Sequence, residues 1–229
     1  MRLFSSDQYT RSEFDLGSPL STPLGSLERQ YFTDLGTTAL RRERGCYRHL
    51  SENGVVCRWT TPRCVLEELF VALTPSASPQ MNEIECRAVL VRLEALASGV
   101  TFDARLSWLP GFRWTEGIGV PGEGLEARSW FDNAWDVTVG TEDSEYLTAR
   151  SRVEKWMPRR LAAYFEEHPE DVLQIERESF SIHIPELESG ERCQFQFVIA
   201  WGPRREDEST LWLAVDQRSE ELLAAADCH

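Results

Sequence analysis

The chain has 229 residues, of which 41% are apolar and 27% are charged. This composition is typical of a globular domain and excludes a collagen-like or intrinsically disordered chain. The sequence holds no run of 18 uncharged apolar residues, and its first residues lack an apolar segment. We therefore expect neither a membrane span nor a secretory signal. We expect a cytoplasmic location, where the six cysteines stay reduced.

The formal charge of −14 belongs to one half of the chain. Residues 1–114 hold 13 acidic and 13 basic side chains, whereas residues 115–229 hold 25 and 11. A negative field repels phosphate groups, so nucleic acid is an unfavourable ligand. The same field attracts basic proteins, and a basic partner protein is the expected one.

The first predicted elements in chain order are loops and short strands. Residues 1–26 form a loop-rich arm, since residues 17–26 are rich in turn formers and show no periodicity. Residues 46–50 and 55–59 flank an Asn-Gly turn and predict a hairpin. For residues 64–73 a strand and a helix are both open, because a short apolar run does not distinguish them.

Two later segments, 88–108 and 180–201, share one construction: a strand, a Leu-x-Ser-Gly turn and a second strand that ends in Trp. Strict alternation places Phe102, Ala104, Leu106 and Trp108 on one face. We interpret both segments as hairpins. A further β-run at 211–215 is expected to continue an antiparallel meander.

Helical spacing of apolar residues predicts a helix over 144–168, which Pro158 should break into two pieces. A short helix is expected over 219–226. Together the elements predict one domain over 1–229, with an arm (1–26), a β block (27–140), the helix (144–168) and a second β block with a terminal helix (172–229). The expected fold class is a mainly antiparallel β-sandwich, with α+β as the alternative.

A weak resemblance agrees with this fold. Residues 83–108, residues 180–201, Val215-Asp216 and the closing run 222–226 resemble a group of uncharacterised β-sandwich-like proteins from high-GC bacteria of the actinobacterial type. The resemblance covers about a third of the chain and contains no catalytic motif. It implies the fold only.

Recognisable catalytic and cofactor motifs are missing from the sequence. No Gly-x-Ser-x-Gly elbow occurs, and the chain has no phosphate-binding Gly-x-x-x-x-Gly-Lys and no lysine before Lys155. Residues 117–122 match Gly-x-Gly-x-x-Gly, a pattern that binds pyrophosphate at the N-terminus of a following helix. Pro121 is incompatible with such a helix here, so we interpret these residues as a loop. We therefore expect no catalytic site of a known type and no cofactor.

One cysteine and histidine group has the residue types of a zinc site: Cys46, His49, Cys57 and Cys64. Their later spacings of seven and six residues are not those of a paired zinc ribbon. We expect buried thiols beside a surface histidine, and no bound metal.

Aromatic rings and carboxylates gather at residues 130–136, where they could anchor a partner or pack over a sheet edge. The candidate partner-binding residues are Trp114, Trp130, Trp135, Asp132, Asp136, Glu206, Asp207 and Glu208. The expected function is that of a non-enzymatic protein-binding or accessory protein of the inhibitor, immunity or assembly type. The alternative is a hydrolase of unrecognised family that uses Asp132, Asp136 or His183.

Overall fold

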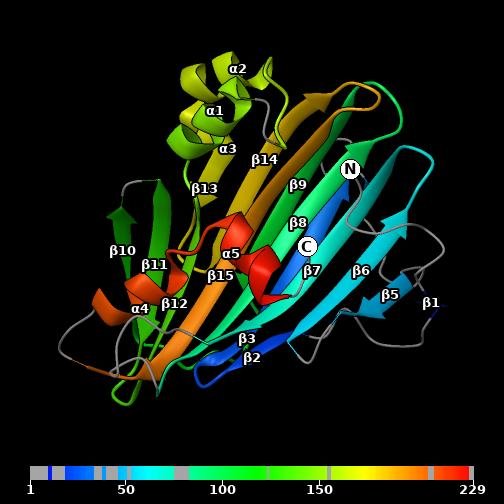
Figure 1. Cartoon of the computed structure of the whole chain (residues 1–229). Helices are drawn as coiled ribbons and strands as arrows, with labels where there is room; N and C mark the ends of the chain where they lie inside the picture. The colour runs from blue at the N-terminus through cyan, green and yellow to red at the C-terminus, as the bar shows by residue number, and fades with distance from the viewer. Residues whose placement is uncertain are drawn as a thin grey trace.

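Two antiparallel sheets lie face to face, and short helices cover one end and one outer face (Figure 1). The computed structural model describes residues 10–11, 19–33, 38–39, 46–50, 53–74, 83–122, 124–153, 156–205 and 209–226. The expected mainly antiparallel β-sandwich is confirmed. No helix in these residues is long and apolar enough to cross a membrane.

The larger sheet has nine strands within the described residues. Its order is β1 (Thr10–Arg11), β5 (Cys46–His49), β6 (Gly54–Thr60), β7 (Cys64–Leu73), β8 (Glu85–Ala95), β15 (Arg192–Pro203), β12 (Trp135–Glu142), β11 (Leu125–Phe131) and β10 (Glu116–Gly122). The hairpin expected about the Asn-Gly turn is confirmed as β5 and β6, and residues 64–73 form a strand.

The smaller sheet has the order β13 (Leu173–Ile175), β14 (Ser179–Leu187), β9 (Val100–Trp108), β3 (Gly25–Thr33) and β2 (Leu20–Thr22), and β4 (Thr38–Ala39) pairs with β3. The alternating apolar face of β9 points into the sandwich, as predicted. The arm expected to be loop-rich contains strand β2. Its three residues form a strand because they pair with the start of β3.

The expectation of two hairpins is wrong. Strand β8 pairs with β15 and β9 pairs with β14, so each Leu-x-Ser-Gly turn carries the chain from one sheet to the other. The two strands that flank each turn thus lie in opposite sheets and do not pair with each other. Both turns use a glycine with positive φ, Gly99 (71°) and Gly190 (87°), and they are joined by a 2.8 Å hydrogen bond from Gly190 N to Ala95 O.

Two further expectations are wrong at the ends of the larger sheet. Residues 211–215 lie in helix α4 (Ser209–Val215), where the buried residues Leu211, Ala214 and Val215 have helical spacing. Residues 117–122 lie in the edge strand β10 and are not a loop. An edge strand tolerates Pro121, because only one of its sides needs ladder hydrogen bonds.

The predicted helix over 144–168 is divided into two pieces, as expected, and Pro158 lies between them. Its pieces are α1 (Ser144–Arg152) and α2 (Leu161–Glu167), and α3 (Pro169–Val172) follows. The carboxylate of Asp143 caps α1 by accepting a 2.7 Å bond from Tyr146 N.

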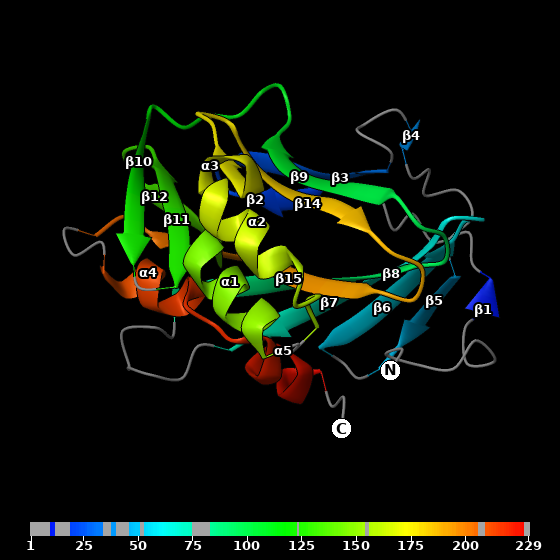
Figure 2. The ribbon, with the colours of Figure 1, turned by 90° about the horizontal axis from the view of Figure 1, so that it is seen from above.

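All three helices lie over one end of the sandwich (Figure 2). They bury Leu147, Leu161, Phe165 and Val172 in the main core.

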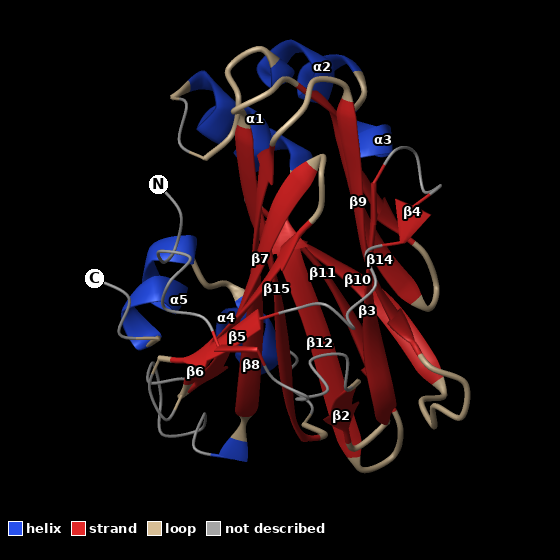
Figure 3. Cartoon of the chain, turned by 90° about the vertical axis from the view of Figure 1, so that its right-hand side faces the viewer, coloured by secondary structure: helices blue, strands red, loops and turns tan. Residues whose placement is uncertain are grey.

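Helices α4 and α5 (Ser219–Ala225) cover the outer face of the larger sheet (Figure 3). Their apolar residues form a second core with the outward side chains of β7, β8 and β15. The strands β8 and β15 are therefore buried on both faces, and the smaller sheet keeps a polar outer face.

A buried ion pair joins the two sheets inside the sandwich. Arg29 on β3 donates from Nε to Glu68 Oε1 on β7 at 2.6 Å, and Tyr31 donates its hydroxyl to the same oxygen at 2.7 Å. Both charged side chains are at most 3% exposed. A buried ion pair need not stabilise the folded state relative to an apolar pair. Loss of one partner is nevertheless destabilising, because it leaves the other charge buried without a partner.

We therefore expect Glu68→Ala to lower the free energy of unfolding by about 3–5 kcal/mol. Denaturant titration measures the change, and the exposed Glu178→Ala is the control, with an effect of about 0.5 kcal/mol or less. Equal effects of the two substitutions would contradict this role for the pair.

Candidate functional site

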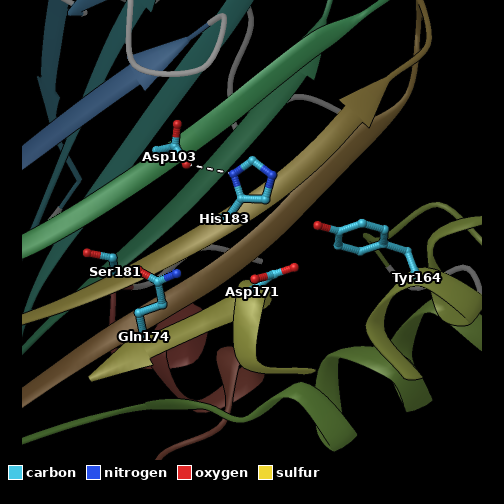
Figure 4. Close-up of a pocket in the computed structure, with 6 residues that line it drawn as sticks. All are labelled: Asp103, Tyr164, Asp171, Gln174, Ser181 and His183. Atoms are coloured by element: carbon cyan, nitrogen blue, oxygen red, sulfur yellow. Dashed lines mark hydrogen bonds and ion pairs between the residues drawn. The ribbon is translucent and has the colours of Figure 1, made fainter. Parts of the chain in front are cut away.

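A polar cavity of about 330 Å³ lies between the outer face of the smaller sheet and the helices at its end. The sheet contributes Asp103, Gln174, Ser181 and His183, and the helices contribute Tyr164 and Asp171 (Figure 4). Its volume is in the range of small-molecule sites. All six lining residues carry hydrogen-bonding groups, whereas most such sites are lined mainly by apolar residues.

Strand register brings Asp103 and His183 together. They are direct partners in the β9–β14 ladder, and residues directly opposite each other project from the same face of a sheet. Each lies between two fully buried apolar neighbours, Phe102 and Ala104 for Asp103, and Ile182 and Ile184 for His183. Burial of these neighbours turns the two polar side chains to the outer face.

The two side chains form a tight hydrogen bond. Nδ1 of His183 lies 2.7 Å from Oδ1 of Asp103, and their side chains are 24% and 30% exposed. An ionised carboxylate can only accept, so His183 donates from Nδ1–H, and in the neutral ring Nε2 is then an acceptor. In Figure 4 the ring nitrogen not bound to Asp103 lies on the side of the ring that faces Tyr164.

The helices supply the opposite side of the cavity. Tyr164 precedes Phe165 in α2 and Asp171 precedes Val172 in α3, and both of these neighbours are buried in the core. The Tyr164 hydroxyl points toward His183 in Figure 4. Burial, and then the carboxylates of Asp171 and Glu170, raise the pKa of Tyr164, so its hydroxyl stays protonated.

Ser181 and His183 do not form a nucleophile and base pair of the serine hydrolase type. They are two residues apart on one face of β14, which separates their Cβ atoms by about 7 Å. Direct proton transfer needs hydrogen-bond contact. The arrangement instead suits an imidazole that acts on a water molecule or on the ligand itself.

Three exposed residues at the rim of the cavity have the donor types of a metal site. Ligand atoms of His168, Glu170 and Asp171 lie within 4.8 Å of one another. His168 Nδ1 and Asp171 Oδ2 are 4.0 Å apart. An imidazole and two carboxylates suit several divalent cations, but all three side chains are solvated.

The tryptophans singled out as partner anchors have different surroundings. Trp114 and Trp130 are buried in the core, where Trp114 stacks on Phe112 at 4.4 Å and Trp130 packs edge-on against Trp108. Trp135 is 37% exposed at the start of β12. The three rings thus form no common surface.

The acidic residues singled out with them do not line the cavity either. Asp132 Oδ1 accepts hydrogen bonds from the backbone N of Ala134 and Trp135 and closes the β11–β12 turn. Asp136 is buried on β12 in the larger sheet, away from the sheet that carries His183. The other three, Glu206, Asp207 and Glu208, lie outside the described residues.

Two of the four possible zinc ligands, Cys57 and Cys64, are buried free thiols. Burial, and then the Glu68 carboxylate, raise the pKa of Cys57, which favours the neutral thiol over the thiolate that binds zinc. Cys46 and His49 lie on β5, and their side chains are outside the described part of the structure. The expectation of no bound metal therefore stays a prediction.

No family model matches the chain, and no curated protein matches it either. Among solved structures, a chain described as a kojibiose phosphorylase from the human microbiome matches with a TM-score of 0.48 and 9% identity, over 87% of this chain and 26% of that one. A bacterial glucoamylase complexed with acarbose matches with a TM-score of 0.49 and 9% identity, over 89% of this chain and 31% of that one.

This chain therefore spans about a quarter to a third of the length of the two enzymes. At 9% identity the likeness concerns the fold and assigns no role to a residue of this chain. The expectation of a non-enzymatic protein-binding or accessory protein is wrong against this finding, because both of these chains are described as enzymes. The basic partner protein expected from the charge is not tested by it and stays a prediction. The hydrolase alternative agrees better with it, and of that alternative's residues the cavity contains His183.

The hydrogen bond to Asp103 predicts the tautomer of His183. A bond to a charged acceptor is worth about 1.5–3 kcal/mol, so the neutral ring should be mostly Nδ1–H. We expect Asp103→Ala to remove this preference and Asp171→Ala to leave it unchanged. Nitrogen-15 chemical shifts of the two ring nitrogens measure the tautomer, and an Nε2–H ring in the unsubstituted protein would contradict the assignment.

Proposed function

We propose that the cavity is the active site of a hydrolase that acts on a small polyhydroxylated substrate, a saccharide, with His183 as the general base. The Asp103–His183 hydrogen bond is the observation that carries the proposal. It fixes the orientation of the imidazole and leaves Nε2 as a proton acceptor at a cavity of ligand size.

The lining of the cavity supports the substrate class. Gln174 and Ser181 offer amide and hydroxyl groups beside Tyr164, and these groups both donate and accept hydrogen bonds. A hydroxyl-rich molecule can pair with them, whereas an apolar ligand would leave them without water or partners. A saccharide has such hydroxyl groups around its whole ring.

The proposed reaction uses the two sides of the cavity. His183 Nε2 takes a proton from a water molecule, whose oxygen attacks the substrate, and the Asp103 carboxylate stabilises the imidazolium that forms. The raised pKa of Tyr164 keeps its hydroxyl protonated as a donor. This hydroxyl gives its proton to the leaving oxygen, and the proton on His183 returns to Tyr164 through solvent.

The cytoplasmic location expected from the sequence stays a prediction. Cys57, Cys64, Cys86 and Cys193 are free thiols, which agrees with a reducing compartment.

The proposal predicts turnover that depends on one histidine. On a panel of 4-nitrophenyl glycosides, we expect the protein to release nitrophenol and His183→Gln to lower kcat by about 10²- to 10⁴-fold, because the general base is lost. The matched control is His168→Gln, whose side chain is half exposed and is not among the residues that line the cavity. Absence of turnover on the whole panel, or turnover that is the same in His183→Gln, would overturn the proposed function.

A further inference from the structure

The cavity has two chemically different sides. On the sheet side the carboxylate of Asp103 is paired with an imidazole N–H at 2.7 Å. On the helix side the side chain of Asp171 is 55% exposed, and its Oδ2 lies 4.0 Å from Nδ1 of His168. Asp171 therefore presents a less neutralised negative charge to a ligand than Asp103 does.

No arginine or lysine among the described residues that line the cavity balances this charge. The six lining residues include two carboxylates and, within the described part of the chain, no arginine or lysine. The guanidinium of Arg105, the cross-strand neighbour of Ser181, is already bound to Glu176 at 2.9 Å and to Ser179 at 3.1 Å. The upward shift of the Tyr164 pKa, to which Asp171 and Glu170 contribute after burial, agrees with a negative potential on this side.

Hydrogen-bond acceptors from the helices and from β13 match the donors of an ammonium group. A primary ammonium has three N–H donors and no acceptor. The Asp171 carboxylate, the Tyr164 hydroxyl oxygen and the Gln174 amide oxygen are acceptors that border the same cavity (Figure 4). Nε2 of His183 is not needed for this contact and stays available to a water molecule.

We propose that the ligand of this cavity is a polyhydroxylated primary amine, such as an amino sugar, whose ammonium group binds to Asp171 beside Tyr164 and Gln174. This inference rests on the proposed function for the location of the site and adds the charge of its substrate. Anionic ligands such as sugar phosphates are disfavoured by the same two carboxylates.

The expected size of the preference is modest, because the Asp171 side chain is half exposed. Exposed ion pairs contribute little, and hydrogen bonds to charged groups contribute more. We expect the ammonium group to improve the dissociation constant about five- to tenfold over a hydroxyl group in the same place.

Two pairs of probes isolate the ammonium group. Tris(hydroxymethyl)aminomethane has an ammonium group where pentaerythritol has a hydroxymethyl group, and glucosamine has one where glucose has its 2-hydroxyl group. Binding to metal-free protein is followed by NMR at a pH at which the amines are protonated. The cationic member of at least one pair should bind five- to tenfold more tightly, and the preference should fall as salt is raised.

The variants Asp171→Asn and Glu170→Gln are a matched pair, since both remove one charge from α3 and only Asp171 lines the cavity. The preference should disappear in Asp171→Asn and remain in Glu170→Gln. Equal binding within both probe pairs, or a preference that survives Asp171→Asn, would overturn the inference.

The two proposals can fail separately. Turnover of neutral glycosides that depends on His183, with no preference for amines, would refute the inference and keep the proposed function. Binding of amines that depends on Asp171, with no turnover on the glycoside panel, would keep the inference and refute the hydrolase. A divalent cation that displaces the amines and needs His168 and Glu170 would assign Asp171 to a metal site, and would also overturn the inference.

Discussion

The pairing of β9 with β14 sets the geometry of the cavity, because the side-chain period of a strand is two and a slip by one residue would exchange its faces. Phe102, Ala104, Ile182 and Ile184 are buried between the sheets, so their neighbours must face outward. Asp103 and His183 then meet as direct partners at 2.7 Å, although 80 positions separate them in the chain. The hydrophobic core thus positions a polar site that lies outside it.

Local patterns in the sequence predicted local structure well. Alternation identified the buried face of β9, the Asn-Gly turn identified the β5–β6 hairpin, and Pro158 divided the predicted helix. Patterns that need tertiary information failed. The sequence of a strand, a turn and a second strand is the same whether the two strands lie in one sheet or in two. The five apolar residues at 211–215 suit a strand or a helix, and only their contacts with the outer face of the larger sheet distinguish the two.

The candidate site was mostly beyond the reach of the sequence. The sequence offered His183 as one of three candidate hydrolase residues, but nothing marked Asp103 as its partner, because register between distant strands is set by the whole core. The aromatic cluster at 130–136 attracted attention by composition, yet Trp130 is buried and Asp132 closes a turn. A usable signal existed in the polar residues at alternate positions of β9 and β14, but it had meaning only once those strands were known to be neighbours.

The two turns that cross between the sheets also constrain how the chain folds. Since β8 continues into β9 and β14 into β15, each sheet contains one strand from each crossing, and neither sheet can be completed from a contiguous half of the sequence. Contacts between residues so far apart in the sequence form only after a long loop has closed, and the entropy lost in closing it precedes the favourable contact energy. Such contacts therefore slow folding. The chain should therefore assemble as one slow cooperative unit, and ribosomal synthesis would have to pass residue 200 before β8 gains its second partner, β15.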